Sequence, residues 1–475
     1  MDGLEAVELS LSEITHENIA LRVDSEYFKK AGIVADELVR SRKWAHLREL
    51  ASRVQSFGAY SLCNQVVYLE SGIPFLRCVN IKQGIVDFNE VLYINNEANK
   101  LLWKSAVKPG MVLLSMSGSV GNAAVALNNW TYPVNSNQDI AKITPANLNP
   151  YYLTAYFGSQ TGQAQLLRHP VGSVQQHIFL WQIENLAIPL ASPSFQNEIE
   201  NQFKAAYERF DHSHSLYSAA EETLLKELSL IGWKPRDEQS TTRSVKDAAS
   251  ANRLDAEHFQ TKYWAIRSKC ISYPDGAEPL SELITSITNG VESREFVDQG
   301  VPYLRVGDMR MLRIDPQSPV LIPRLAAVAL KSKIQLKAGD VLIARSGSIG
   351  QAAVVTPEHI DSILSSHLMR IRLKPNSRVQ PVYFALFMAT LPGVQQVLMH
   401  SNGGVVPEIS QPNLKLVVVP LLKKKVQDRL AELIEESQKT ENCASELLGR
   451  TWEAVNIAIK SDEKAALDFL KRVRN

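Results

Sequence analysis

Short apolar runs that end at glycine or proline recur along the chain and predict strands. MVLLSM (111–116) and DVLIAR (340–345) each lead into a glycine-containing turn and then into a second apolar run. Each therefore predicts two strands joined by a tight turn. ENLAIPL (184–190) and KLVVVPL (415–421) predict two further strands, each followed or ended by a proline. These segments supply the β part of the expected fold.

Longer segments carry apolar residues at helical spacing. Residues 149–167 and 380–398 each start near a proline and predict helices. Residues 195–231 and 426–459 form much longer amphipathic patterns. An apolar stripe of about 45 Å, at about 1.5 Å per residue, must be covered, and its partner is expected to be the second long helix. The chain is therefore expected to be mixed α/β (α+β).

The chain contains the same plan twice. Corresponding segments follow one another in unchanged order, separated by between 228 and 231 positions. The pairs are ALRVDSEYF and NRLDAEHF, GIPFLR and GVPYLR, SGSVGNAAV and SGSIGQAAV, NQDIAKI and SSHLMRI, and NPYY and QPVY. The sequence therefore predicts a tandem duplication of a unit of about 230 residues. The expected segments are 1–190 for the first recognition domain, 191–232 for the central long helix, 233–421 for a linker and the second recognition domain, and 422–475 for the C-terminal long helix and tail.

Composition and charge narrow the function classes. Lys and Arg total 51 against 50 Asp and Glu, so a nucleic-acid-binding face would have to be a local patch. The acidic N-terminus does not resemble a secretory signal, and no apolar run approaches the roughly 20 residues that span a bilayer. Four scattered cysteines fit a reducing compartment. These features predict a cytoplasmic protein without a membrane partner.

The repeated SGS turns raise the alternative of a nucleotide-binding enzyme. A phosphate-binding loop of the Walker type requires a lysine after its second glycine, but Asn122 and Gln351 stand there. The residues that follow predict a strand, whereas a dinucleotide fingerprint opens a helix. A tight turn between two strands is the favoured interpretation. It is compatible with Ser117, Ser119, Ser346 and Ser348 approaching a DNA phosphate.

Two other motifs favour structural explanations. NPYY (149–152) is similar to the N-P-P-Y of DNA amino-methyltransferases but lacks the second proline, so a helix start is favoured. His212 and His214 point to different sides of one helix, which argues against a shared metal ion. No catalytic triad and no metal-nuclease pattern is recognisable, so no catalytic and no metal-binding residues are predicted.

The remaining expectation is recognition of DNA. Basic residues cluster between 305 and 345, and amide side chains occupy similar places in the first copy. Arg suits phosphates and guanine, and Asn and Gln suit adenine. Matching positions are interpreted as scaffold and differing ones as specificity. The predicted DNA-contacting residues are Arg77, Asn80, Lys82, Ser117, Ser119, Asn122, Asn137, Gln138, Arg305, Arg310, Arg345, Ser346, Ser348, Gln351 and His367.

The chain resembles the specificity subunits of type I restriction–modification systems. The resemblance rests on GIPFLR and GVPYLR, on the segments around both SGS turns, and on GGVVPEISQPNLKLVVVPL followed by a long helix. It covers nearly the whole chain, although Met116 replaces the equivalent of Arg345 in the first copy. The resemblance implies a tandem duplication of target recognition domains, each followed by a long helix, with the two helices pairing as an antiparallel coiled coil.

The resemblance also implies a function. Such subunits catalyse nothing and hold two copies of a DNA methyltransferase subunit, and in some systems restriction (translocase) subunits, on a bipartite site in double-stranded DNA. No cofactor is expected in this chain, because S-adenosylmethionine, and ATP where restriction subunits are present, bind to the partners. The rival expectations are a nucleotide-binding enzyme that uses the SGSxG loops and a coiled-coil scaffold that does not recognise DNA.

Overall fold

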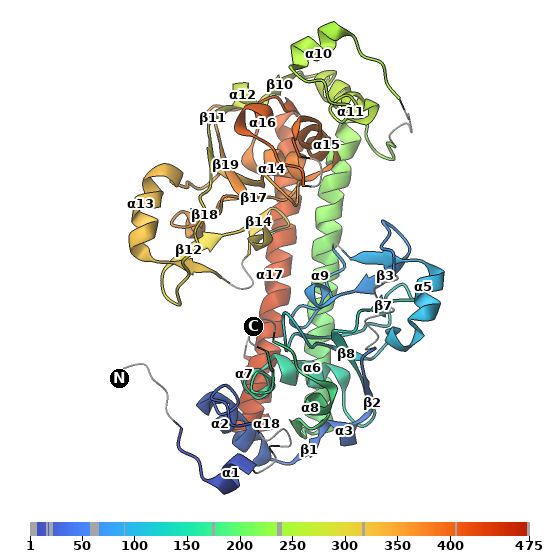
Figure 1. The fold of residues 1–475 in the computed structure, drawn as a ribbon, viewed down its shortest axis with the longest axis vertical. Helices are drawn as coiled ribbons and strands as arrows, with labels where there is room; N and C mark the ends of the chain where they lie inside the picture. Colours follow the sequence, from blue (N-terminus) through green and yellow to red (C-terminus); the bar gives the residue numbers. More distant parts are fainter. Residues whose placement is uncertain are drawn as a thin grey trace. The chain divides into compact units, whose positions relative to one another are not determined.

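The computed structural model describes residues 7–15, 18, 22–57, 66–89, 91–172, 176–234, 240–315, 319–403 and 406–472. These residues form two compact units (Figure 1). Unit 1 consists of Met1–Arg209 and Cys443–Asn475, and unit 2 consists of Phe210–Asn442. Both boundaries fall inside long helices, so the compact units cut across the four consecutive segments expected from the sequence.

Unit 1 contains three small sheets and the helices that cover them. Its strands are β1 (Trp44–His46), β2 (Ala51–Gln55), β3 (Ile73–Leu76), β4 (Leu92–Ile94), β5 (Val112–Ser115), β6 (Ala123–Val125), β7 (Asn135–Ser136), β8 (Ile140–Pro145) and β9 (Ala187–Pro189). Its helices are α1 (Leu11–Thr15), α2 (Lys30–Arg40), α3 (Leu47–Leu50), η1 (Cys78–Asn80), α5 (Asn96–Leu101), η2 (Trp103–Ser105), α6 (Pro150–Gly158), α7 (Gln160–Leu166), α8 (Leu180–Glu184) and α18 (Glu463–Lys471).

Unit 2 repeats most of this list. Its strands are β10 (Ala277–Pro279), β11 (Ile284–Asn289), β12 (Val301–Leu304), β13 (Met309–Arg310), β14 (Arg313–Ile314), β15 (Leu321–Ile322), β16 (Val341–Ala344), β17 (Ala352–Val354), β18 (Ile363–Leu364), β19 (Leu368–Leu373) and β20 (Val418–Pro420). Its helices are α10 (Val245–Ala251), α11 (Thr261–Ile271), α12 (Leu280–Leu283), η3 (Val306–Asp308), α13 (Arg324–Ile334), η4 (Pro357–His359), α14 (Pro381–Ala389), α15 (Leu391–His400) and α16 (Gln411–Leu414).

The sheets have the same strand order in both units, which confirms the predicted duplication. The four-stranded sheets run β2-β8-β5-β6 and β11-β19-β16-β17, and the three-stranded sheets run β4-β3-β7 and β15-β12-β18. Even a local irregularity is repeated, because β2 and β11 each shift register near their first residues. The predicted strands before and after each SGS turn are β5 and β6 in unit 1 and β16 and β17 in unit 2.

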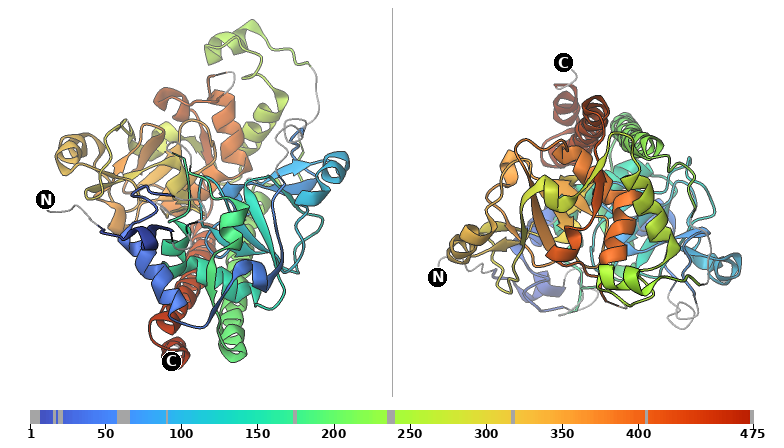
Figure 2. Two further views of the ribbon diagram at one scale, coloured as in Figure 1. Left: turned by 60° about the horizontal axis from the view of Figure 1, so that its bottom comes forward. Right: turned by 90° about the horizontal axis from the view of Figure 1, so that it is seen from above.

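The predicted helices after the sheets are also present, each divided into two. Asn149 caps α6 by accepting hydrogen bonds from the backbone N–H groups of Tyr151 and Tyr152, with Pro150 in the first turn. This geometry confirms NPYY as a helix start. In unit 2, α14 lies against β16 and β17. Figure 2 shows the strands and helices of residues 300–420 in yellow to orange. The sequence predicted only a polar linker for 234–250, whereas residues 245–251 form α10, capped by Ser244.

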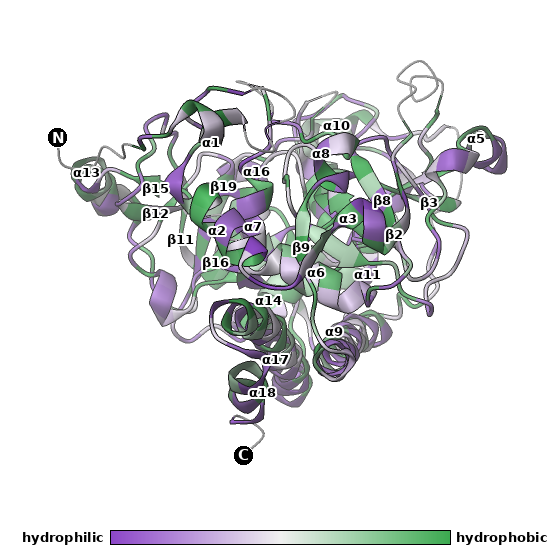
Figure 3. Ribbon diagram, turned by 90° about the horizontal axis from the view of Figure 1, so that it is seen from below, coloured by the Kyte–Doolittle hydropathy of each residue, from purple (hydrophilic) through white to green (hydrophobic). Residues whose placement is uncertain are grey.

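Two long helices contribute to both units. Helix α9 (Pro193–Glu227) has 35 residues and α17 (Lys424–Lys460) has 37. Hydrophobic and hydrophilic residues lie on different sides of α17 (Figure 3), as its amphipathic pattern predicts. Within unit 2 the Ser213 hydroxyl donates to the Ser437 carbonyl over 2.8 Å. Later residues of α9 share a core with earlier residues of α17, so the predicted antiparallel pairing is confirmed in this unit.

No single helix among the described residues is long and apolar enough to cross a membrane. The helices α14 and α15 meet the length and composition criteria only when taken together, and they are bent by 68°. Both contribute buried side chains to the core of unit 2.

Candidate nucleic-acid interface

In unit 2, three strand ends place polar side chains at one edge of the four-stranded sheet. Ala344 at the end of β16 is paired with Leu368 at the start of β19, and Asn289 at the end of β11 is paired with Met369. Arg345 follows β16 and His367 precedes β19, so the antiparallel register brings them together. Three predicted site residues, Arg345, Ser346 and His367, are therefore neighbours at this edge.

A backbone frame holds these residues in place. The Arg345 N–H donates to the His367 carbonyl, and the Ile409 N–H donates to the Arg345 carbonyl, both over 2.9 Å. The Ser346 hydroxyl and Nδ1 of His367 form a hydrogen bond of 2.7 Å. The frame thus fixes the SGS turn against two other segments of unit 2.

The Arg345 guanidinium forms an ion pair with the Glu408 carboxylate. Glu408 is held by two backbone hydrogen bonds of 2.8 Å with Asn402, one in each direction. The Glu408 side chain is 51% exposed and the Arg345 side chain 23%. Glu408 was not among the predicted site residues, although it lies in the segment VPEISQP, where the two copies differ.

Unit 1 has the same backbone frame with other side chains. The Met116 N–H donates to the Asp139 carbonyl over 2.8 Å, and the Ile178 N–H donates to the Met116 carbonyl over 2.9 Å. His177 and Val171 exchange two backbone hydrogen bonds of 2.9 Å, as Glu408 and Asn402 do in unit 2. Asp139 and His177 are thus two further candidate residues that the sequence interpretation did not select.

The predicted amides of unit 1 gather around Asp139. The Asn137 side-chain amide donates to Oδ2 of Asp139 over 3.2 Å, and the Gln138 amide donates to the same oxygen over 3.5 Å. Ser117 forms a backbone bridge with His177 and is only 6% exposed. The sheet edge that carries the SGS turn, called the SGS edge below, therefore includes Ser117, Asn137 and Gln138 in unit 1, as it includes Arg345 in unit 2.

The SGS segments are turns between strands of one sheet, as predicted. Gly118 and Gly121 have φ values of +66° and +90°, and Gly347 and Gly350 have +75° and +100°. Only glycine adopts such angles without cost, which explains the repeated G-S-x-G pattern. Ser119 and Ser348 lie exposed on these turns, while Asn122 donates a side-chain hydrogen bond of 3.0 Å to the Ile81 carbonyl. Gln351 is half-buried behind its turn.

Other predicted residues stabilise loops after β3 and β12. Asn80 is 2% exposed, and its side chain accepts from the Arg77 N–H over 2.9 Å and donates to the Asp87 carbonyl over 3.1 Å. Asp308 plays the same part in unit 2, where it accepts from the Arg305 N–H over 2.7 Å. The Asn80 amide is thus engaged by backbone, while Lys82 remains half-buried beside it.

Arg310 lies on the hairpin of β13 and β14, which packs beside β17. Its guanidinium forms ion pairs with Glu441 of α17 and, over 3.5 Å, with Asp315. Arg313 adds a contact of 3.4 Å to Glu441, which is only 2% exposed. A buried carboxylate requires such partners. Arg310 and Arg345 therefore have different acidic partners, Arg310 with Glu441 and Asp315 and Arg345 with Glu408, although both belong to the basic stretch recognised in the sequence.

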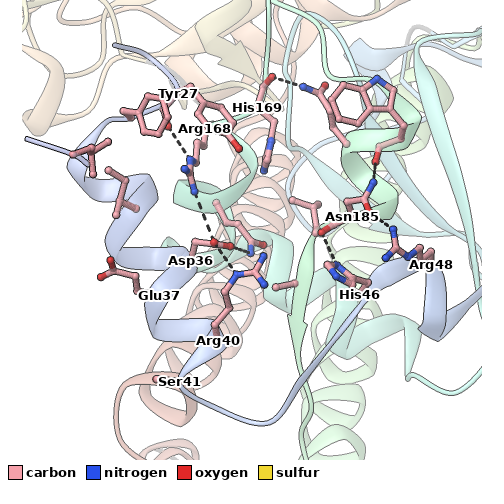
Figure 4. A pocket seen from close by; sticks show the side chains of 18 of the residues that line it. Tyr27, Asp36, Glu37, Arg40, Ser41, His46, Arg48, Arg168, His169 and Asn185 are labelled. Atoms are coloured by element: carbon pink, nitrogen blue, oxygen red, sulfur yellow. Dashed lines mark hydrogen bonds and ion pairs between the residues drawn. The ribbon is translucent and has the colours of Figure 1, made fainter. Parts of the chain in front are cut away.

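A cavity of about 880 Å³ lies in unit 1 between α2, α8 and the end of α7 (Figure 4). Asp36 pairs with Arg40 over 2.9 Å and approaches Arg168 at 3.8 Å, so its carboxylate offsets nearby cations. The Arg168 guanidinium also lies 4.2 Å from the Tyr27 ring centroid. Burial, together with the Arg168 charge, lowers the pKa of His169 to about 4, which keeps this ring neutral near pH 7. None of the predicted DNA-contacting residues lines this cavity among the residues that the structure describes.

The arrangement offers polar recognition rather than an evident reaction centre. Within the described ranges, no group of three or more His, Cys, Asp or Glu side chains could hold a metal ion. The cysteines Cys78 and Cys270 are buried, and burial raises the pKa of both thiols, which opposes thiolate chemistry.

A family model and one relative match parts of this chain. Residues 280–443 match the family described as "Type I restriction modification DNA specificity domain". A stretch of 144 residues is 26% identical to the type I restriction enzyme EcoBI specificity subunit of Escherichia coli. That match covers 29% of this chain and 30% of the relative's length, less than a third of either protein.

Two solved structures show low similarity over most of the chain. One is the S subunit of a type I restriction-modification system from M. genitalium, with 14% identity, a TM-score of 0.38, and coverage of 88% of this chain and 96% of that one. The other is the HsdS subunit of Thermoanaerobacter tengcongensis, with 14% identity, a TM-score of 0.28, and coverage of 88% and 97%.

Proposed function

Because residues 280–443 match the family described as "Type I restriction modification DNA specificity domain", we propose that this chain selects the DNA sequence for a methyltransferase-containing defence complex. The family match is the observation that carries the proposal. The matched relative is named as the specificity subunit of a restriction enzyme. The chain itself is non-catalytic in this proposal, and the chemistry belongs to its partners.

The internal duplication supports recognition of a bipartite site. Unit 1 lies mostly outside the matched residues, yet it repeats the strand orders of unit 2. Each unit recognises one half-site in double-stranded DNA, and the bases between the half-sites are not contacted. Because the side chains on the common frame differ, the two half-sites differ in sequence.

Each half-site is recognised through the sheet edge that carries the SGS turn. In unit 2 this edge presents Arg345, Ser346, Ser348 and His367, and in unit 1 it presents Ser119, Asn137 and Gln138. The exposed serines and turn amides suit phosphate oxygens, and the larger polar side chains suit base edges. Arg310 and Asn80 contribute indirectly, because their side chains hold loops in place.

The duplication also supports a pair of identical partners. Two copies of a methyltransferase subunit bind, one for each recognition unit, and restriction or translocase subunits join in complexes that also cleave DNA. S-adenosylmethionine, and ATP where translocation occurs, are bound by these partners. Such a complex acts in the cytoplasm, where the host DNA lies.

The test is to express the full chain with its methyltransferase and to map methylated bases across a genome. We expect one bipartite motif, with two constant half-sites around a gap of fixed length. Methylation without sequence preference by a correctly assembled complex would contradict the proposal.

A domain exchange makes the prediction sharper. Residues 253–421 lie between the two long helices, so another family member's second domain can replace them while α9 and α17 are retained. We expect only one half-site of the methylated motif to change. The reciprocal exchange of the first domain is the control and must alter the other half-site. A chimera that kept both original half-sites would show that this region does not select the DNA sequence.

A further inference from the structure

One frame of backbone hydrogen bonds holds three corresponding positions at the SGS edge of each unit. In each unit the residue before the SGS turn donates its N–H to the residue that precedes the neighbouring strand, β8 or β19. Its carbonyl accepts from a residue in the segment that leads to the last strand, β9 or β20. The corresponding residues are Arg345 and Met116, His367 and Asp139, and Glu408 and His177. The peptide frame is thus constant, while all three side chains change in size or charge.

This contrast is sharp because the neighbouring residues hardly change. The turn itself reads SGSIG in unit 2 and SGSVG in unit 1. Two domains that recognise different DNA sequences require a constant frame with variable side chains. The frame fixes where the side chains lie, and the side chains determine which bases are contacted. The three positions are therefore candidates for specificity-determining residues.

In unit 2, two of these side chains offer complementary hydrogen-bonding groups. The Arg345 guanidinium supplies only donors, in a fork that suits two acceptors, and the ionised Glu408 carboxylate supplies only acceptors. Their ion pair keeps the two groups adjacent before any ligand is bound. Half of the Glu408 side chain is exposed, so it is accessible to a ligand at this edge.

The major-groove edge of a G·C pair presents the matching groups. Guanine offers N7 and O6 as acceptors, and cytosine offers the N4 amino group as a donor. We propose that Arg345 and Glu408 together recognise one G·C base pair, Arg345 on guanine and Glu408 on cytosine. This inference rests on the proposed function, and it adds Glu408 as a specificity-determining residue.

A base edge fits this pair better than a DNA phosphate does. A phosphate bound by Arg345 would lie beside the Glu408 carboxylate, and two like charges at such short range repel each other. A base edge carries no net charge and satisfies both side chains at once. The nearby Ser348 hydroxyl lies exposed on the turn and has no acidic partner among the described contacts, so it suits a backbone contact.

Unit 1 does not present the same pair. Met116 is 3% exposed and has no polar hydrogen, and His177 takes the place of the carboxylate. The G·C contact is therefore assigned to the half-site of unit 2 alone. Asp139 and His177 would make a different set of contacts on the half-site of unit 1.

The test uses the full chain assembled with its methyltransferase and a library of duplexes in which the second half-site is randomised. For the unaltered chain we expect one position that is strictly G·C among the methylated products. In Glu408→Gln we expect that position to lose preference for G·C by roughly tenfold, because a neutral amide replaces the carboxylate that accepts from the cytosine amino group. Glutamine also favours adenine, so A·T should rise there. Arg345→Ala should relax the same position.

Arg429→Ala is the matched control, because it removes another exposed ion pair of unit 2, that with Glu432 on α17. It should leave every position of the motif unchanged. The unaltered first half-site serves as an internal check that each variant complex is assembled.

Two outcomes would overturn the inference while leaving the proposed function intact. In one, the Glu408 and Arg345 variants retain the unaltered motif at every position. In the other, they lower methylation equally on all sequences, as loss of a phosphate contact or of folding would do. Failure of the proposed function looks different, since the unaltered complex would then show no sequence preference.

Discussion

Lys142 occupies an unusual environment in the core of unit 1. Its side chain is fully buried, and Nζ donates to the Ser136 hydroxyl over 3.0 Å and to the Ile140 carbonyl over 3.2 Å. Burial lowers its pKa to about 8. Arg370 has the corresponding place in unit 2, where its guanidinium donates to Ser286 and Thr288 and burial lowers its pKa as well. Lys142 and Arg370 are thus buried basic side chains at corresponding positions of the two four-stranded sheets.

The buried lysine predicts a pH-dependent stability of unit 1. Between about pH 8 and pH 10.4, the unfolded chain retains a proton on Lys142 that the folded chain has lost. Stability should therefore rise as pH increases through this window. In Lys142→Met, the free energy of unfolding at pH 7 should increase by up to about 3 kcal/mol, and the rise with pH should flatten. Urea unfolding at pH 7 and pH 9.5 measures both effects.

Lys108→Met provides the comparison, because Lys108 is exposed on the surface of the same unit. Its pH dependence should match that of the unaltered chain. If Lys142→Met retained the full slope between pH 7 and pH 9.5, the titration would belong to another group.

At the scale of single residues, sequence identified side-chain chemistry better than side-chain environment. Arg345, Ser346 and His367 were each predicted as site residues from their chemistry, and the register of β16 and β19 brings them together. Arg310 carries the same charge but pairs with Glu441, 131 positions away in sequence. No local pattern identifies such a partner, because it comes from a helix that packs on the hairpin only in the folded unit.

At the scale of elements, the paired strands around each turn could be predicted because glycine and apolar spacing are local features. Helix breaks were harder to predict. Ser159 ends α6 and caps α7, accepting a hydrogen bond from the Gly162 N–H over 3.0 Å. Gly158 and Gly162 on either side of it are local signals of a break, but the helical spacing of the apolar residues favoured one continuous helix. The S-x-x-D pattern at Ser244 and Asp247 is a local signal for α10, but the polar composition of the segment favoured a linker.

The SGS turn predicts a clear effect of glycine substitution. Gly350 has φ +100°, and a Cβ atom there would lie 2.8 Å from a methyl carbon of Val394 on α15. Gly350→Ala should lower the free energy of unfolding of unit 2 by roughly 1–3 kcal/mol, because both backbone and contact are strained. Urea unfolding of the purified chain measures this loss.

Gly307→Ala is the matched substitution in the same unit. A Cβ atom at Gly307 would meet nothing within 4 Å. Its effect should stay within about 0.5 kcal/mol. Equal stabilities of the two alanine variants would mean that the Gly350 turn relaxes freely, and the tight-turn explanation of the repeated G-S-x-G spacing would fail.

At the scale of the whole molecule, each long helix is shared between the two compact units. Residues 193–209 of α9 belong to unit 1 and residues 210–227 to unit 2, and α17 is divided in the opposite order. The length and amphipathic pattern of both helices could be predicted from sequence. Which half supports which unit depends on tertiary contacts, so linear segment boundaries could not show it.

The shared helices predict that a C-terminal truncation acts on the N-terminal unit. Residues 443–475 belong to unit 1, where Asn456 accepts hydrogen bonds of 3.0 Å from the Thr161 N–H and hydroxyl, and the Ile459 carbonyl accepts one of 2.8 Å from Arg42. Ending the chain at Asn442 removes these partners and uncovers α7. Hydrogen exchange should then show lost protection across α6 and α7, while β19 and α14 of unit 2 remain protected.

Ending the chain at Lys460 is the graded comparison. This shorter deletion removes α18, and with it the Glu463 carboxylate that accepts from the Ser192 N–H over 2.7 Å, but retains Asn456 and Ile459. Protection of α7 should largely survive, with the loss confined to the start of α9. If the longer truncation instead exposed unit 2 and spared unit 1, the assignment of the second half of α17 to unit 1 would be incorrect. The antiparallel sharing of the helices would then need a different division, in which each unit takes the whole of the long helix that follows it in sequence.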